Sequence, residues 1–278
     1  MKDKVLQIIA REILPRVVLG FAVLLVLSPL LYMIGISMKT GSEVFANPAN
    51  PFPVSLNFEN YLSAISKLNY WRMLFVSIAY ALGVTLGQIF LALPAAYVFA
   101  FANFPGRDLL FSIFLGTLTI PFVITYIPNY LLLSQFKLLN SLPGMILPQL
   151  ANAYGIFLLR QNFHSFPKSV IEAARIDGLN HWSILWKVLV PPHLPVLVAL
   201  GVYIFVNTWN QYVWPLLVAQ TPEMFTLTVG VQNFANGEGG SNWPALMAAS
   251  TLAILPTLVI FLLVRQQILN TLTEGAVK

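Results

Sequence analysis

The stretch IEAARIDGLNHWSILWKVLVPP occupies residues 171–192 and lies between two long apolar runs. It mixes charged and apolar residues, whereas each flanking run has the length of a membrane-spanning helix, which needs about 20 apolar residues. The segment is therefore expected outside the lipid, between two spans. The rest of the sequence has to decide on which side of the membrane it lies.

Composition places most of the chain in lipid. Of its 278 residues, 58% are hydrophobic and only 9% are charged, with a mean hydropathy of +0.76. Soluble domains carry about 25% charged residues, so this chain has too few polar groups to cover a globular surface. The apolar runs predict an all-α membrane protein with six transmembrane helices, at approximately Val17–Met38, Met73–Phe101, Leu109–Leu133, Leu138–Leu159, His193–Val218 and Pro244–Val264.

Lysine and arginine indicate the orientation. With the N-terminus in the cytoplasm, six spans return the C-terminus to the cytoplasm, and the inside segments hold 11 of the 15 cations. Cytoplasmic loops are enriched in these residues, so both termini and residues 171–192 are predicted to be cytoplasmic. The inside cations are Lys2, Lys4, Arg11, Arg16, Arg107, Arg160, Lys168, Arg175, Lys187, Arg265 and Lys278.

This topology divides the chain into three parts. Residues 1–72 hold the N-terminal segment, the first span and an external loop; residues 73–265 hold the other five spans and the cytoplasmic loop 163–192; residues 266–278 form a cytoplasmic tail. The external loop 39–71 is rich in proline and asparagine, which predicts irregular structure, with a short helix at 62–68. A second external loop, 220–243, is polar and glycine-rich, and its stretch MFTLTVGV fits either a strand or a short helix.

The cytoplasmic loop contains a short helix with recognisable ends. Pro167 suits a helix start, and Ser169 followed by Glu172 three residues later predicts a capping box. Gly178 is suited to the left-handed conformation that ends many helices. We therefore predict a short capped helix between Pro167 and Gly178.

One face of this helix carries small and apolar side chains, namely Val170, Ala173 and Ala174. Alanine lets another backbone approach closely, which favours a docking surface for a second protein. The alternative is a helix that rests on the membrane. Glu172 and Asp177 disfavour that alternative, because anionic lipid repels them.

A second amphipathic piece, HWSILWKVLV, follows the helix. Pro191 and Pro192 are expected to stop it, because proline lacks the N–H that a helix needs. The sequence thus predicts two short helices that meet at an elbow on the cytoplasmic side.

The fifth span carries several polar and aromatic residues. At helical spacing they share one face, which is expected to point into the bundle because amides are costly in lipid. Amides with an aromatic ring suit a sugar or polyol, which offers hydroxyls and an apolar face. These residues are Asn207, Asn210, Gln211 and Trp214; Asn129, Tyr130 and Tyr126 of the third span are candidates for the opposite wall.

Other classes of function lack their motifs in this sequence. It has no GxxxxGK[ST], GxGxxG, HExxH or GxSxG pattern, and it has no cysteine. No cofactor is therefore expected in this chain, nor is nucleic acid expected as a partner. A secondary transporter or channel is the alternative to a subunit of a larger machine, but no span holds a charged residue that could relay ions. A membrane-embedded enzyme is the third alternative, and no nucleophile–base or metal constellation supports it.

The motif EAARIDG, followed after nine residues by VLVP, resembles the EAA loop of the membrane subunits of ATP-binding-cassette importers. Val188 and Val190 stand where that pattern has isoleucine and leucine. The stretches FLLRQNFHSFPKSVIEAARIDG and WNQYVWPLL are similar to carbohydrate-importer permeases of the maltose-transporter second-subunit type. YWRMLFVSIAYALGVTLGQI and the loop GEG…W resemble the glycerol-3-phosphate permease branch in particular.

This resemblance implies a multi-pass permease subunit, with the type I importer fold, in the inner (plasma) membrane of a bacterium or archaeon. Its implied partners are a nucleotide-binding ATPase dimer that binds ATP and Mg²⁺, a second homologous permease, an external solute-binding protein and membrane lipid. The chain itself would not be an enzyme. The residues implied to couple ATP hydrolysis to transport are Glu172, Ala173, Ala174, Asp177 and Gly178. Asp177 is expected to cap the next helix or to pair with Arg175.

Overall fold

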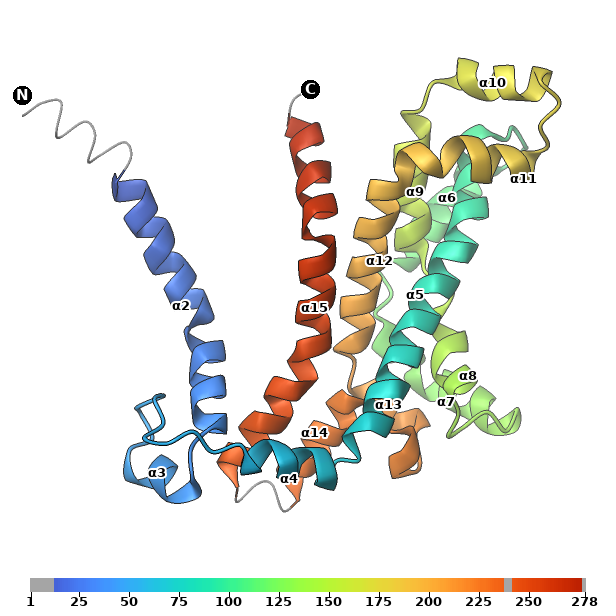
Figure 1. Cartoon of the computed structure of the whole chain (residues 1–278). Coiled ribbons are helices and arrows are strands. Elements are labelled where there is room, and N and C mark those ends of the chain that lie inside the picture. Colours follow the sequence, from blue (N-terminus) through green and yellow to red (C-terminus); the bar gives the residue numbers. More distant parts are fainter. Residues whose placement is uncertain (1–12, 238–241, 277–278) are drawn as a thin grey trace, which may run out of the picture. The chain divides into compact units, whose positions relative to one another are not determined.

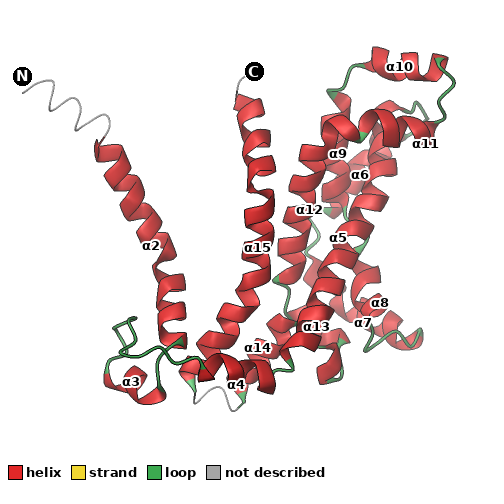
Figure 2. Cartoon of the chain, viewed as in Figure 1, coloured by secondary structure: helices red, strands yellow, loops and turns green. Residues whose placement is uncertain are grey.

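The structure is a computed structural model that describes residues 13–237 and 242–276. All regular elements in these ranges are helical, which confirms the all-α class (Figure 2). Lys2, Lys4, Arg11 and Lys278 of the topology prediction lie outside the described residues, as do Glu238, Gly239 and Gly240 of the glycine-rich loop.

The described chain forms two compact units. One consists of the chain up to Tyr70 together with Val231–Ile254, and the other consists of Trp71–Gly230 together with the chain from Leu255 onward. The second unit contains both regions that the sequence singles out, the loop 163–192 and the polar part of the fifth span.

Among the described residues, four helices are long and apolar enough to cross a membrane. They are α2 (Leu14–Ser37), α5 (Tyr70–Phe101), the stretch Pro191–Trp209 that contains α12 (Leu194–Trp209), and Trp243–Arg265 of α15 (Trp243–Ala276). They correspond to the first, second, fifth and sixth predicted spans. The number of candidate spans rises to six if two bent helix pairs each count as one span.

The third and fourth predicted spans are not continuous helices, which corrects the prediction. In the third, α6 (Arg107–Thr117) is followed by η2 (Phe122–Thr125) and α7 (Tyr126–Gln135), with a bend of 88°. Pro121 causes this break, because it has no N–H and adopts an extended backbone with ψ of 131°.

In the fourth predicted span, α8 (Leu142–Ile146) and η3 (Leu147–Gln149) meet α9 (Ala153–His164) at 50°. Asn152 starts α9 by accepting the backbone N–H of Tyr154 on its Oδ1, at 2.8 Å. An N-cap side chain stabilises a new helix end at this point, so the chain can bend inside an otherwise apolar segment.

The fifth predicted span, His193–Val218, also ends early. Helix α12 stops at Trp209, with Asn210 as its C-cap, and a separate short helix, α13, covers Val213–Val218. Asn207, Asn210, Gln211 and Trp214 therefore do not share one helix face, contrary to the prediction.

The loops contain more helix than predicted. In the loop 39–71, α3 (Gly41–Ala46) forms through a capping box between Thr40 and Glu43, and α4 (Glu59–Lys67) starts before the predicted 62–68 helix. In the loop 220–243, η6 (Pro222–Met224) precedes α14 (Leu227–Asn236), so the ambiguous MFTLTVGV stretch becomes helical where it is regular.

Within the second unit, α5, α9 and α12 run alongside one another, and α10 (Lys168–Ile176) and α11 (His181–Ser183) lie across one end of them (Figure 1). Pro191 and Pro192 were predicted to stop the second amphipathic piece of the loop, but the helical chain continues past them. It continues from α11 through a π-helical segment, η4 (Ile184–Leu189), and η5 (Pro191–His193) into α12. In η4 the N–H of Val190 bonds five residues back to the carbonyl of Leu185 at 2.9 Å.

Candidate functional site

The N-terminal end of α10 differs from the prediction. Pro167 occupies the N-cap position and makes no side-chain cap hydrogen bond, and the helix begins at Lys168. Ser169 therefore lies inside the first turn, so the predicted capping box with Glu172 does not form. The proline fixes the start because its backbone is extended at ψ of 119° and its ring cannot donate to a helix.

The C-terminal end of α10 confirms the prediction for Gly178. Its φ is +81°, in the left-handed region. Its N–H bonds to the carbonyl of Arg175 at 3.0 Å, and the N–H of Leu179 bonds to the carbonyl of Ala174 at 3.0 Å. These two bonds make a Schellman motif, which satisfies the last carbonyls of the helix and turns the chain sharply.

The two faces of α10 have different roles. Ile171 and Ala174 are buried, and the helix packs through this face on η4. Ala174 thus turns inward, whereas Val170 and Ala173 face outward; the predicted common face does not form. The exposed face also carries Glu172 and Ile176, whose side chain is 87% exposed.

The segment after Gly178 is anchored by hydrogen bonds from other residues than Asp177. Asn180 caps α11 by accepting the N–H of Ser183 at 2.8 Å. Nδ1 of His181 lies 2.8 Å from the hydroxyl of Tyr97 near the end of α5. Asp177 is exposed and forms no ion pair with Arg175 in the described chain, so neither expectation for its side chain is met.

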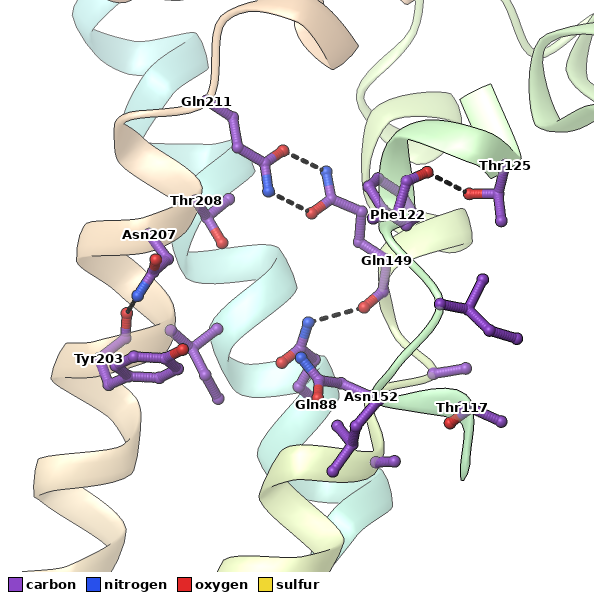
Figure 3. A pocket seen from close by; sticks show the side chains of 15 residues that line it. Gln88, Thr117, Phe122, Thr125, Gln149, Asn152, Tyr203, Asn207, Thr208 and Gln211 are labelled. Atoms are coloured by element: carbon purple, nitrogen blue, oxygen red, sulfur yellow. Dashed lines mark hydrogen bonds between the residues drawn. The ribbon is translucent and has the colours of Figure 1, made fainter. Parts of the chain in front are cut away.

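A second polar site lies where three helix breaks meet. The side-chain amides of Gln149, at the end of η3, and Gln211, after α12, point toward one another (Figure 3). They exchange two hydrogen bonds, at 2.7 and 2.8 Å. The hydroxyl of Tyr80 on α5 donates to Oε1 of Gln211 at 2.6 Å and accepts from Nε2 of Gln149. These three side chains form a closed network, here called the amide clasp.

Two glycines on α5 let the clasp form. A Cβ on Gly83 would meet Cδ1 of Ile146 at 2.5 Å, and a Cβ on Gly87 would meet Cδ2 of Leu150 at 2.4 Å. Small residues four apart allow a neighbouring backbone to approach a membrane helix closely. Gln149 lies between these two contact points and is thereby brought within reach of α5.

Gln88 extends the network by one further bond. Its Nε2 donates to the backbone carbonyl of Gln149 at 2.7 Å. Its Oε1 has no hydrogen-bond partner, although the side chain is only 7% exposed. A buried acceptor without a partner is unusual and costs stability.

Gln88, Gln149 and Gln211 line a cavity of about 450 Å³. This volume is within the range of about 300–1,000 Å³ found for small-molecule sites. Fifteen residues line it, and none of them carries a charge. The polar members are Gln88, Thr117, Thr125, Gln149, Asn152, Tyr203, Asn207, Thr208 and Gln211. The cavity can therefore offer both donors and acceptors to a neutral polar molecule.

The structure brings two of the predicted solute-path residues, Asn207 and Gln211, to this cavity. The indole N–H of Trp214 instead bonds to the carbonyl of Met145 at 3.0 Å in the core. The remaining predicted residues, Asn210, Asn129, Tyr130 and Tyr126, are not among those that line it.

Gln88, Gln149 and Asn152 were not among the predicted solute-path residues, although the sequence contains a signal for Gln88. Gln88 interrupts the apolar run ALGVTLGQIFLAL, and an amide inside a membrane helix is costly unless it has a partner or a function. Gln149 and Asn152 flank a break that only the structure shows.

Known proteins are similar to this chain over most of its length. Residues 89–270 match the family model described as binding-protein-dependent transport system inner membrane component. The sn-glycerol-3-phosphate transport system permease protein UgpE of Escherichia coli O1:K1 / APEC is 32% identical over 265 residues, covering 93% of this chain and 94% of that protein. UgpE of Salmonella typhi is 31% identical with the same coverage.

A solved structure is also similar. The crystal structure of a bacterial ABC transporter involved in the import of the acidic polysaccharide alginate contains a chain that matches with a TM-score of 0.80 and 25% sequence identity. The match covers 91% of this chain and 95% of the other. It therefore includes most of the helices described above.

Proposed function

This chain belongs to the family of inner membrane components of binding-protein-dependent transport systems, and on that premise we propose that it forms one half of a solute path driven by a separate ATPase. It is a multi-pass permease subunit of the inner membrane. The proposed assembly adds a dimer of ATP-binding subunits, a second homologous permease and an external solute-binding protein. ATP and Mg²⁺ are bound by the ATPase subunits, not by this chain.

The main support for this proposal is a continuous helical connection between α10 with its elbow and the amide-lined cavity. From Asn180 the chain runs as α11, η4, η5 and α12 to Trp209, and Tyr203, Asn207 and Thr208 of α12 line the cavity. Helix α10 packs on η4 through Ile171 and Ala174. A force applied to α10 is therefore transmitted along packed helices to the residues that line the cavity.

We propose that α10 is the docking element for the ATPase. Its exposed face offers Glu172 to a basic group, Ala173 for close backbone approach and Ile176 to an apolar pocket. The Schellman motif at Gly178 fixes the angle between α10 and α11, so movement of the ATPase would carry both. Asp177 adds a second exposed carboxylate at the same end.

The proposed orientation places α10 and both termini in the cytoplasm. It is supported by the excess of lysine and arginine on that side in the predicted topology. The loop with α14 then faces outward, toward the solute-binding protein.

The proposed solute is a sugar, a polyol or a glycerol-3-phosphate-like molecule. The names of the relatives favour the last, and the uncharged amide-lined cavity favours the hydroxylated part of any of them. Asn207 and Gln211 contact the solute in this proposal. Trp214 and Tyr126 support the wall through Phe122, with ring centroids 5.3 to 5.9 Å apart. Asn210, Asn129 and Tyr130 stay predicted residues of the solute path.

Copurification and reconstitution test the proposal. Affinity purification of this chain from its native membrane should recover an ATP-binding subunit and a second permease. The reconstituted complex should take up solute only with ATP and the external binding protein. Uptake that proceeds with this chain alone, driven by an ion gradient, would instead identify a secondary transporter.

A further inference from the structure

Gln88, which lies beside the amide clasp, has a buried acceptor oxygen without a hydrogen-bond partner. Gln149, Gln211 and Tyr80 satisfy one another, whereas Oε1 of Gln88 has no hydrogen-bond partner. Gln88 lines both the cavity of about 450 Å³ and an adjoining one of about 360 Å³. Gln88 thus borders both cavities.

The orientation of this amide is fixed by its neighbour. Nε2 of Gln88 lies 2.7 Å from the backbone carbonyl oxygen of Gln149, an atom that only accepts hydrogen bonds. Rotating the amide by half a turn would place two oxygens against each other. Oε1 therefore stays free, and it requires a donor to offset its burial.

We propose that Gln88 accepts a hydrogen bond from a hydroxyl of the transported solute, and that this chain holds the uncharged, hydroxyl-bearing part of that solute. The inference rests on the importer function proposed above and narrows its substrate site. The fifteen lining residues carry no charge, so an anionic group of the solute has to be held outside this cavity. A polyol or sugar hydroxyl supplies the missing donor, whereas a carboxylate or a fully ionised phosphate supplies only acceptors.

The geometry also predicts selection against solutes without the hydroxyl. A site whose buried polar group stays unpaired rejects an analogue that lacks the matching group more strongly than an apolar pocket can. Asn152 and Thr208, which line the same cavity, provide further polar contacts for a second hydroxyl.

The test removes the acceptor from the protein and the hydroxyl from the probe. The variant is Gln88→Met, which keeps the length of the side chain. The matched control is Thr85→Val, one turn earlier on α5, because the Thr85 hydroxyl is buried and bonds only to the carbonyl of Ala81 at 2.7 Å. The complete importer is reconstituted, and ATP-driven uptake is measured with sn-glycerol 3-phosphate and with its 1-deoxy and 2-deoxy analogues.

For each probe, uptake by the variant is divided by uptake of the same probe by the wild type, so any preference of the solute-binding protein cancels. We expect Gln88→Met to raise the KM for sn-glycerol 3-phosphate by about tenfold and to leave one deoxy analogue unaffected. Thr85→Val should treat all three probes alike. An equal loss for all three probes with Gln88→Met would show a structural role and overturn the inference.

A second measurement separates this inference from the proposed function. The purified complex is titrated without ATP, using mannitol and then sodium sulfate, an anion that only accepts hydrogen bonds, while tryptophan emission is recorded. A saturable response to mannitol that Gln88→Met abolishes supports the inference, even if no probe is transported. No response of the wild type to mannitol, or a Gln88-dependent response to sulfate, overturns it. Failure of the proposed function appears separately, as the absence of ATP-driven uptake of any solute.

Discussion

The side-chain amides of Gln149 and Gln211 exchange two hydrogen bonds across two separate helix breaks, one after η3 and one after α12. Sixty-two residues separate them in the chain. Each amide both donates and accepts, so either side chain alone would leave a donor and an acceptor unpaired. The pair therefore ties the fourth and fifth apolar segments together at the edge of the cavity.

Breaking this pair on both sides should cost less than the two single breaks added together. Gln149→Leu leaves Gln211 without its partner, and Gln211→Leu leaves Gln149 without its own. Each single change is expected to lower the free energy of unfolding by about 1–3 kcal/mol, and the double change by less than the sum. Denaturant titration of the purified chain in detergent measures the three values. Strict additivity would contradict the clasp.

A control for this cycle is Asn207→Leu. Asn207 is exposed and donates only to the carbonyl of Tyr203 in its own helix, at 2.7 Å. Its replacement should change the free energy of unfolding by no more than about 0.5 kcal/mol. A loss as large as that of the clasp variants would indicate a general effect of apolar substitution around the cavity.

The cost of a substitution at Gly178 should depend only on how readily the new residue adopts a positive φ. A Cβ at this position meets no atom within 4 Å, so only the positive φ of 81° opposes a side chain. Asparagine should be accepted, alanine should cost about 1 kcal/mol, and valine should cost most because β-branched residues avoid this region. Uptake by the reconstituted importer should fall in the same order, with the protein still present in the membrane.

Gly106 supplies the matched control for this series. Its φ is 82° and its surroundings are equally open, but it lies in the turn before α6 and not in α10. Gly106→Val should impose a similar local strain without uncoupling ATP hydrolysis from uptake. Equal uncoupling by both valine variants would argue against a specific role for the α10 elbow.

The two isoleucines of α10 should separate stability from docking. Ile176→Ser removes a side chain that is 87% exposed, so the free energy of unfolding should change little, while recovery of the ATPase subunit on copurification should fall. Ile171→Ser places a hydroxyl in a site only 2% exposed and should destabilise the chain itself. Glu172→Ala should likewise lower recovery of the ATPase subunit and leave the free energy of unfolding nearly unchanged. Normal ATPase recovery and normal uptake with both exposed-face variants would refute the docking surface.

These residues show how far the sequence could be interpreted. The end of α10 was predictable because a glycine at the end of an amphipathic run has few other uses. Its start was not, because Ser169 and Pro167 both fit a helix start and only the fold decides between them. The helix breaks after Thr117 and Gln149 depend on tertiary packing. Hydropathy averaged over about 20 residues does not reveal such local breaks. Gln88 was visible in the sequence, but its unpaired oxygen depends on where Gln149 lies.

Cysteine labelling should test the proposed orientation without background, since the chain has no cysteine. Asn236→Cys at the end of α14 should react with a membrane-impermeant maleimide in intact cells. Asp177→Cys, and a cysteine next to Arg160, should react only after permeabilisation, as should one in the C-terminal tail. The reverse pattern would invert the topology and would place α10 outside, where no ATPase could reach it.

The loop 39–71 should lose structure in acid through Glu43. Its carboxylate accepts the N–H of Thr40 at 2.8 Å and the N–H of Val54 at 3.2 Å, and the bond from Thr40 is the main cause that lowers the pKa of Glu43 below its ordinary value of 4.5. A group with a lowered pKa in the folded state contributes stability above its unfolded pKa, and that contribution is lost as the pH falls through the folded pKa. The loop should therefore be unaffected between pH 7 and pH 5 and should loosen progressively below about pH 4.5.

Hydrogen exchange measures this directly. After correction for the intrinsic rate at each pH, protection of the amides of Thr40 and Val54 should fall below pH 4.5 in the wild type. Glu43→Gln keeps an acceptor oxygen but has no charge to lose, so its protection should be lower at pH 7 and independent of pH. If Glu43→Gln instead shows the same fall in acid as the wild type, another group controls the loop and the carboxylate bonds of Glu43 contribute little to it.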